Sequence, residues 1–181
     1  MRAAVISFTE HGQRLAETLA QGLSERGIVC RIWVKRKGAS RDGTDVKVVD
    51  GSLRAWTGEQ FSVNDALIFI GAAGIAVRSI APYVRSKKTD PAVVVLDEQG
   101  RHAISLLSGH IGGANGLTRL VAELVGAEAV ITTATDLNGK FAVDEFAARR
   151  NLYMDSMETA KEIAARLVAD EPVGMDSAFP V

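Results

Sequence analysis

The chain has 181 residues, of which 47% are hydrophobic and 24% charged, and its formal net charge at pH 7 is −1. This length suits one α/β domain and the start of a second, and the composition is ordinary for a globular protein. The near-neutral charge argues against a general nucleic-acid-binding protein, which is normally clearly basic. No apolar run reaches the length of a membrane span, and a single cysteine, Cys30, excludes an internal disulfide framework. The chain starts with a strand-like segment where a secretory leader would stand, so we expect a cytoplasmic protein.

Short apolar runs alternate along the chain with amphipathic segments. The apolar runs predict strands at residues 3–8, 28–34, 46–49, 66–70, 92–96, 103–107 and 129–132. Apolar residues spaced by three or four predict helices after Thr9, at 52–57, after Gly74, at 113–125, near 141–150 and at 156–168. The tetrapeptide Glu98-Gln99-Gly100-Arg101 predicts a hairpin turn between the fifth and sixth strands.

This alternation predicts a three-layer α/β fold: a mostly parallel, open, Rossmann-like sheet with helices on both faces. Right-handed crossovers would bring every strand-to-helix turn to the carboxyl edge of the sheet, where open α/β sheets bind ligands. We therefore expect four loops to converge there, at residues 9–12, 71–74, 108–113 and 132–136. We expect an N-terminal α/β domain over 1–145, then a helical segment and the start of a truncated middle region over 146–181.

The most informative loop is Ser108-Gly109-His110-Ile111-Gly112-Gly113, which ends an apolar run and opens a helix. Glycines let a backbone approach a ligand closely, and a helix N-terminus presents unpaired N–H groups with partial positive charge. An imidazole at this position can exchange protons near neutral pH. The loop therefore predicts an anion-binding site with a catalytic histidine, although a structural, hydrogen-bonded histidine stays an alternative.

A second glycine loop, Gly71-Ala72-Ala73-Gly74, is followed by a cationic segment. Residues 71–91 contain four cations and one carboxylate, namely Arg78, Arg85, Lys87, Lys88 and Asp90. This local excess of positive charge suits a ligand with several carboxylates or phosphates. The alternative is a solvated run after a helix C-terminus, where cations are favoured in any case.

Two carboxylates border strands in polar loops: Asp90 in Thr89-Asp90-Pro91 and Asp136 in Thr135-Asp136-Leu137. They can orient a histidine, a water molecule or ligand N–H groups, but residues of this type also form turns on their own account. The three histidines and Cys30 show no spacing typical of a zinc site.

Five blocks of this sequence, in order, resemble the N-terminal part of the cobalamin-biosynthesis CbiG family. They span residues 69–78, 88–93, 97–100, 105–115 and 132–136, with Asn138-Gly139 after the last. The opening Thr9-x-x-Gly12 also fits the family's first turn. Five ordered blocks are a more specific signal than any single glycine motif.

The resemblance implies a cobalt-precorrin-5A hydrolase of anaerobic cobalamin biosynthesis, which opens the δ-lactone of a cobalt macrocycle and releases acetaldehyde. It implies no cofactor, because the substrate carries the cobalt. We expect His110 to activate water, and N–H groups of residues 71–74 or 112–113 to stabilise the oxyanion. Family members continue further, so we expect this chain to be an N-terminal portion. The alternatives are a non-catalytic corrinoid-binding module of the same pathway and, more distantly, a domain that binds a phosphorylated small molecule.

The predicted site has two groups of residues. The catalytic group is His110, Asp90 and Asp136. The substrate-binding group is Gly71, Ala72, Ala73, Gly74, Arg78, Lys88, Thr89, Ser108, Gly109, Gly112, Gly113, Asn115, Thr133 and Thr135. The expected partners are the macrocycle and either a separate C-terminal domain or further copies of this chain, with no nucleic acid and no membrane.

Overall fold

The computed structural model describes residues 1–39, 45–87, 89–141, 143, 146–147, 150 and 152–178. The chain divides into two compact units, Met1–Ile131 and Thr132–Val181. The domain boundary predicted at residue 145 stays a prediction. Among the described residues, no helix is both long and apolar enough to cross a membrane.

The first unit is built on one sheet of seven strands in the order β3-β2-β1-β4-β5-β6-β7. Strands β1 (Arg2–Ser7), β2 (Val29–Val34), β3 (Val46–Val48), β4 (Ala66–Ile70) and β5 (Ala92–Leu96) run parallel to one another. The strands β6 (His102–Leu107) and β7 (Glu128–Val130) run the opposite way, because β6 pairs antiparallel with β5 and β7 pairs parallel with β6. The prediction of a mostly parallel α/β sheet is therefore confirmed.

The continuous apolar runs are the central strands. Every residue of β4 and β5 is buried, as expected for strands covered on both faces. One face of the sheet packs against Leu19, Leu23 and Val121 of two covering helices. The other face packs against Trp56 and Ile80, and Trp56 also makes an edge-on contact with Phe69 of β4.

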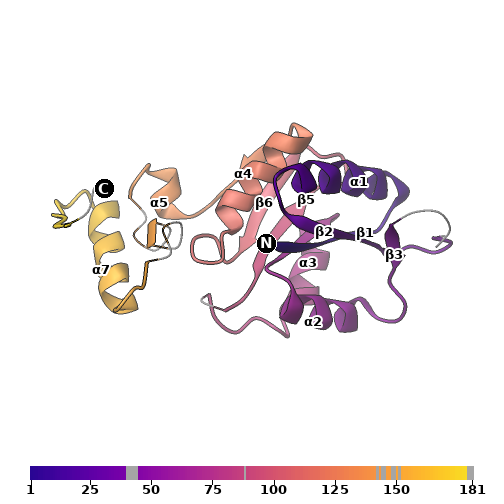
Figure 1. Ribbon diagram of the computed structural model, residues 1–181, viewed down its shortest axis with the longest axis horizontal. Helices are drawn as coiled ribbons and strands as arrows, with labels where there is room; N and C mark the ends of the chain where they lie inside the picture. Colours follow the sequence, from indigo (N-terminus) through magenta and orange to yellow (C-terminus); the bar gives the residue numbers. More distant parts are fainter. Residues whose placement is uncertain are drawn as a thin grey trace. The chain divides into compact units, whose positions relative to one another are not determined.

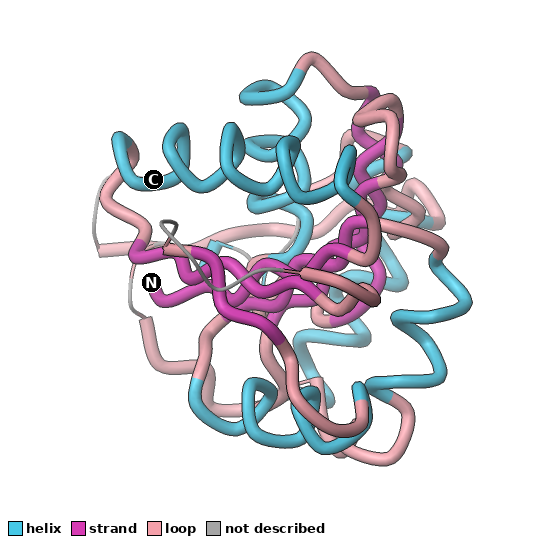
Figure 2. The backbone as a smooth tube through the Cα atoms, turned by 90° about the vertical axis from the view of Figure 1, so that its right-hand side faces the viewer, coloured by secondary structure: helices cyan, strands magenta, loops and turns pink. Residues whose placement is uncertain are grey.

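Four helices complete the three layers (Figure 1). The helices α1 (Glu10–Glu25) and α4 (Ala114–Val125) cover one face, and α2 (Leu53–Val63) and α3 (Ala73–Ile80) cover the other. Figure 2 shows the strands as the middle layer between these helices. Two helix starts have the side-chain caps that their sequences indicate: Thr9 accepts a hydrogen bond from the Gly12 N–H, and Ser52 accepts one from the Ala55 N–H. The helix α2 is longer than the predicted 52–57 segment.

The second unit contains the short helix α5 (Ala134–Leu137) and the helix α7 (Met157–Val168). The side chain of Ser156 caps α7 by accepting a hydrogen bond from the Thr159 N–H, 3.2 Å away, where the sequence indicates a helix start. Half of the residues of the helix predicted near 141–150 lie outside the described part of the chain. The sequence predicts only a loop where α5 forms.

Candidate functional site

The reversal of β6 places the predicted loops at two opposite edges of the sheet. We call the edge where β1 to β5 end the carboxyl edge, and the edge where they begin the amino edge. The loop 71–74 lies at the carboxyl edge, where the Gly71 N–H donates to the Leu96 carbonyl, 2.9 Å away. The loop 108–113 lies at the amino edge, because Leu107 pairs with Val93 near the start of β5. The expected convergence of all the glycine loops at one edge is therefore wrong.

Ser108 and Asp90 fix the two loops that meet at the amino edge. The Ser108 hydroxyl donates a 3.0 Å hydrogen bond to the Asp90 carbonyl oxygen, and both residues are buried. Ser108 has a positive φ of 60°, which is uncommon for a residue with a side chain. Such a conformation persists only where surrounding contacts hold it, and it is found most often at functional sites.

The loop 108–113 is closed against the start of α4 by its own carbonyl groups. The Ala114 N–H donates to the Ser108 carbonyl (3.0 Å) and the Asn115 N–H donates to the Gly109 carbonyl (2.9 Å). Gly113 occupies the N-cap position with φ 80°, so the left-handed conformation there favours glycine. The first two N–H groups of α4 thus already donate hydrogen bonds within the protein. Fewer N–H groups at this helix start are therefore available to bind an anion than the sequence predicts.

His110 lies at the centre of this loop and is half-buried. The Gly113 N–H donates to the His110 carbonyl oxygen, 2.9 Å away, which closes a tight turn around the residue. The backbone of His110 is thus held between a fixed serine and the start of a helix. This is the geometry expected of a residue that must be presented at a defined position.

Asn115 is a positioning residue and not part of a ligand-facing surface. Its side chain is only 1% exposed, and its Oδ1 atom accepts a 2.7 Å hydrogen bond from the Ser105 hydroxyl of β6. This burial favours an internal role for Asn115, and its predicted contact with a substrate stays a prediction. Ser105 was not singled out in the sequence, although its alternation with the apolar residues of the strand indicates that it faces α4.

The carboxylate of Asp90 also has an internal role. Its Oδ2 atom accepts hydrogen bonds from the N–H groups of Arg85 (2.8 Å) and Ser86 (3.0 Å), and the residue is 7% exposed. These bonds join the backbone of residues 85 and 86 to the Asp90 carboxylate and close a turn. The structure thus supports the turn-forming alternative for Asp90, while its predicted catalytic role stays a prediction.

That turn presents cations beside the histidine loop. Arg85, Lys87 and Thr89 are exposed. The Arg85 N–H donates to the Asp90 carboxylate, and the Asp90 carbonyl accepts a hydrogen bond from Ser108. Lys88, a predicted binding residue, lies outside the described residues. At the amino edge the structure therefore joins the turn 85–90, which holds Arg85 and Lys87, to the loop 108–113.

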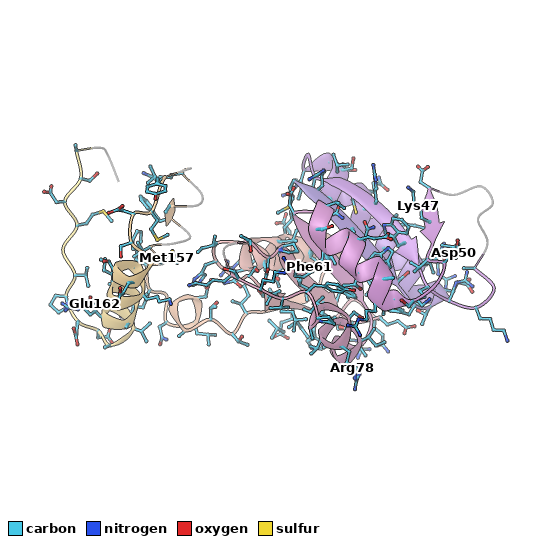
Figure 3. The ribbon with its side chains drawn as sticks, turned by 90° about the horizontal axis from the view of Figure 1, so that it is seen from below. Lys47, Asp50, Phe61, Arg78, Met157 and Glu162 are labelled. Atoms are coloured by element: carbon cyan, nitrogen blue, oxygen red, sulfur yellow. The ribbon has the colours of Figure 1, made fainter. Side chains whose placement is uncertain are left out.

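The carboxyl edge has a separate set of features. Gly71 has φ 153°, and a side chain there would meet the Phe8 ring at 3.0 Å, so glycine is required for packing. Ala72, Ala73 and Gly74 begin α3, whose N-cap has no side-chain hydrogen bond. Arg78 donates to the Gly74 carbonyl (3.1 Å), and its side chain extends away from the sheet (Figure 3). The structure does not bring these residues to His110.

A small open cavity of about 570 Å³ also lies at the carboxyl edge, lined by His11, Glu98, Gln99 and Arg101. The hairpin beside it is organised by Asp97. The Asp97 carboxylate accepts hydrogen bonds from the N–H groups of Gln99 (2.8 Å), Arg101 (3.0 Å) and His102 (2.6 Å). Burial acts to raise the pKa of Asp97, but the N–H groups of His102, Gln99 and Arg101 and the His102 ring together lower it below its ordinary value.

The remaining predicted residues belong to the second unit. The Thr133 hydroxyl donates a 2.8 Å hydrogen bond to the Asp136 Oδ2 atom at the start of α5, so this pair forms a local helix-start contact. The backbone of Thr135 lies within α5, and its side chain is outside the described part.

The described residues offer no other evident nucleophile or metal centre. Burial raises the pKa of the Cys30 thiol to about 11, so this cysteine is a poor nucleophile at neutral pH. No group of three or more His, Cys, Asp or Glu side chains within the described ranges could hold a metal ion. At the amino edge the residues that can exchange protons or carry charge are His110 and the exposed Arg85 and Lys87.

Comparisons with known proteins show which family this chain resembles. Residues 55–136 match the family model described as Cobalamin synthesis G N-terminal. The chain is 52% identical over 127 residues to a cobalt-precorrin-5A hydrolase from Salmonella typhimurium, covering 70% of this chain and 36% of the relative. It is 38% identical over 172 residues to a cobalt-precorrin-5A hydrolase from Priestia megaterium, covering 95% of this chain and 46% of the relative. The chain therefore spans less than half the length of these relatives.

A solved structure shows the same fold. A cobalamin biosynthesis protein G homolog from Sulfolobus solfataricus superposes with a TM-score of 0.56 at 23% identity, covering 98% of this chain and 51% of that one. At this level of identity the likeness concerns the fold alone.

Proposed function

We propose that this chain, which belongs to the cobalamin synthesis G family through its N-terminal domain, forms the N-terminal portion of a cobalt-precorrin-5A hydrolase. It would act in the cytoplasm on a cobalt macrocycle rich in carboxylate side chains. The observation that carries the proposal is the 52% identity to a protein of that name over 127 residues. The amino edge is the part of the fold that we assign to the macrocycle.

His110 is the proposed general base. It would take a proton from a water molecule whose oxygen attacks the lactone carbonyl carbon, and the ring C–O bond then breaks to give a carboxylate and a hydroxyl group. Cleavage of the adjacent C–C bond releases acetaldehyde and needs only further proton transfers. The loop closure at Ser108 and Gly113 supports this role because it fixes the backbone that carries the histidine.

Arg85 and Lys87 are the proposed anchors for substrate carboxylates. They are exposed on a turn that is joined to the histidine loop through Asp90 and Ser108. The N–H groups of residues 71–74 are no longer candidates for the oxyanion site, because they lie at the opposite edge. Any backbone donors must come from the amino edge, where Gly109 and Gly112 are the nearest glycines in sequence to His110. The Gly113 N–H already donates to the His110 carbonyl.

A second function, macrocycle binding without turnover, is favoured by one observation. The first two N–H groups of α4 donate to carbonyls of the loop itself, which reduces the donors available to an oxyanion. In this case the chain would bind the substrate and depend on further polypeptide for catalysis.

Acetaldehyde release from cobalt-precorrin-5A distinguishes these functions. The assay is run with the chain alone and with the chain supplemented by the part of the Priestia megaterium relative that it does not match. We expect His110→Asn to lower turnover by roughly 100-fold or more. His11→Asn, which changes an exposed histidine at the carboxyl edge, is the matched control and is expected to retain activity.

Wild-type turnover by His110→Asn would end the assignment of the general base. Tight binding of the macrocycle with no acetaldehyde under either condition would favour the binding module.

A further inference from the structure

A second cavity lies at the amino edge, between the starts of β1 and β2 and the C-terminal end of α2. Its volume is about 320 Å³, and its lining residues include Arg2, Val29, Arg31, Gln60, Val63 and Asn64. Pockets that enclose whole drug-sized ligands begin at about 300 Å³. This cavity therefore suits one side arm of a large ligand better than the body of such a ligand.

Two arginines of this cavity lie on the same face of the sheet. Arg31 pairs with Ala4, which belongs to the core cluster on the α2 and α3 side. Arg2 stands two residues before Ala4 in the same strand, so it shares that face. Within the described part of the chain, neither guanidinium group has a hydrogen bond or an ion pair, because the Asp65 carboxylate accepts only the backbone N–H of Arg2, 2.7 Å away. Two neighbouring like charges repel each other, and a bound anion would relieve this repulsion.

Gln60 adds a neutral donor to the two cations. The residue is only 9% exposed, and its Oε1 atom accepts a 3.1 Å hydrogen bond from the Asn64 side chain. This bond directs the NH₂ group of the amide away from Asn64. Among the described residues that NH₂ group has no acceptor. The cavity thus combines three side chains that offer hydrogen-bond donors, which is the complement of an anionic oxygen ligand.

The C-terminal end of α2 offers another reason for cations at this place. Cations are favoured near helix C-termini, and the last turn of α2 contains no basic residue of its own. The Gln60 carbonyl, however, already accepts from the backbone N–H of Asn64 (3.1 Å) and from its side chain (3.0 Å). Neither arginine donates to a carbonyl of α2 within the described residues. The helix end therefore leaves the guanidinium donors available to a ligand.

Apolar side chains line the same cavity. Val29 is 63% exposed and Val63 is 52% exposed, and both stand beside the donors. A side arm made of methylene groups that end in a carboxylate matches this combination. Its stem can contact the valines while its oxygens accept hydrogen bonds from the guanidinium groups. Inorganic phosphate has no apolar stem, so the lining favours an alkyl carboxylate.

The cavity lies on the edge that we assign to the macrocycle. Only β4 separates β1 from β5 in the sheet. Neighbouring strands are about 4.8 Å apart, so the start of β1 is roughly 10 Å from the start of β5. The turn 85–90, with its proposed anchors Arg85 and Lys87, comes directly before β5. A macrocycle held at that turn can therefore extend an arm to the cavity.

We infer that this cavity binds one carboxylate arm of the macrocycle. We call it the arm site and define it by Arg2, Arg31, Gln60, Val29 and Val63. The two arginines bind the carboxylate, Gln60 donates a further hydrogen bond, and the valines contact the stem. The inference rests on the proposed function and adds to it a recognition site that takes no part in the chemistry at His110.

The test is a calorimetric titration of the full chain with cobyrinic acid, a cobalt macrocycle that has free carboxylate arms and no lactone. Arg2→Gln and Arg31→Gln are each expected to weaken binding by about tenfold, because each removes a charge-assisted hydrogen bond. Arg54→Gln is the matched control, since Arg54 is an exposed arginine in the first turn of α2, at the opposite end of that helix. Circular dichroism confirms that each variant folds.

A second titration changes the ligand and keeps the protein. With the macrocycle whose arms are amidated, wild-type binding should be weaker, and Arg31→Gln should cause no further loss. Together with weakening by both arginine variants, and none by Arg54→Gln, this result would support the arm site.

Wild-type affinity for cobyrinic acid in both arginine variants would overturn the arm site and would leave the hydrolase assignment intact, because acetaldehyde release tests that assignment separately. Binding of inorganic phosphate that Arg31→Gln weakens, with macrocycle binding unchanged, would also overturn it, since the cavity would then take a different anion. No binding of cobyrinic acid by the wild-type chain would overturn the arm site together with the assignment of the macrocycle to this edge.

Discussion

Gly112 shows how a single residue constrains the histidine loop. A Cβ atom at this position would lie 2.9 Å from the Ser108 carbonyl oxygen and would also collide with the Ser108 Cβ atom. Because Ser108 is buried and tied to Asp90, it cannot move aside without breaking that contact. The glycine is therefore required by packing between two parts of one loop.

We predict that Gly112→Ala lowers the free energy of unfolding by about 1–3 kcal/mol, as overpacking typically does. Gly116→Ala is the matched control, because nothing lies within 4 Å of a Cβ atom there and Gly116 is within α4. The control should raise stability by about 0.5–1 kcal/mol, since alanine favours a helix more than glycine does. Urea denaturation of both variants checks this, and equal effects of the same sign would contradict it.

Asp97 is a residue whose protonation affects the hairpin. Its folded-state pKa is lowered, so its contribution to stability is complete above the unfolded-state pKa and is lost as the pH falls through the folded-state pKa. We predict that Asp97→Asn removes a pH-dependent part of stability in the acidic range, on the order of 1 kcal/mol or less because solvent reaches the carboxylate. Denaturation measured from neutral to acidic pH checks this. Glu98→Gln removes a charge from the same hairpin without removing the Asp97 hydrogen bonds, and it should keep the wild-type pH profile.

The turn 85–90 is the element that carries the proposed anchoring cations. Replacement of Asp90 by alanine leaves the N–H groups of Arg85 and Ser86 without their acceptor, which costs about 0.5–1.5 kcal/mol for each of these partly buried hydrogen bonds. We predict that Asp90→Ala accelerates hydrogen exchange at these two amides, whereas Thr89→Ala, at an exposed neighbour, does not. Unchanged exchange in Asp90→Ala would show that the carboxylate does not hold the turn.

The strands were predictable element by element, but the edge at which the histidine loop lies was predicted wrongly. The spans of β4 and β5 follow from continuous apolar runs, and their residue limits match the prediction. The hairpin at 98–101 was also predicted, and a hairpin necessarily reverses the next strand. Applying that reversal to β6 would have moved the loop 108–113 to the amino edge, so the error came from treating every crossover as parallel.

Burial distinguishes candidate residues that are bonded inside the protein from candidates that are exposed to a ligand, and residue type alone does not. Asn115 and Ser108 have the polar side chains expected of binding residues, yet both are buried and bonded within the protein. The bond from Ser105 to Asn115 joins positions ten residues apart, and no local motif specifies it. Long-range packing decides such roles, and a sequence pattern gives only the residue types that are available.

In the proposed function, the macrocycle binds at the amino edge of the first unit. The family blocks do not all lie on one edge: the segments 88–93 and 105–115 meet there through Asp90 and Ser108, whereas the 71–74 loop is at the carboxyl edge. Open α/β sheets commonly bind ligands at the carboxyl edge. Binding at the amino edge and binding at the carboxyl edge would therefore protect different residues, and the set of protected residues is the footprint of the ligand.

Hydrogen exchange of the full chain with and without cobalt-precorrin-5A measures that footprint directly. We predict slower exchange in peptides covering residues 85–87 and 108–113, with residues 9–12 and 71–74 unchanged. Protection confined to residues 9–12 and 71–74 would contradict binding at the amino edge and would place the ligand at the carboxyl edge.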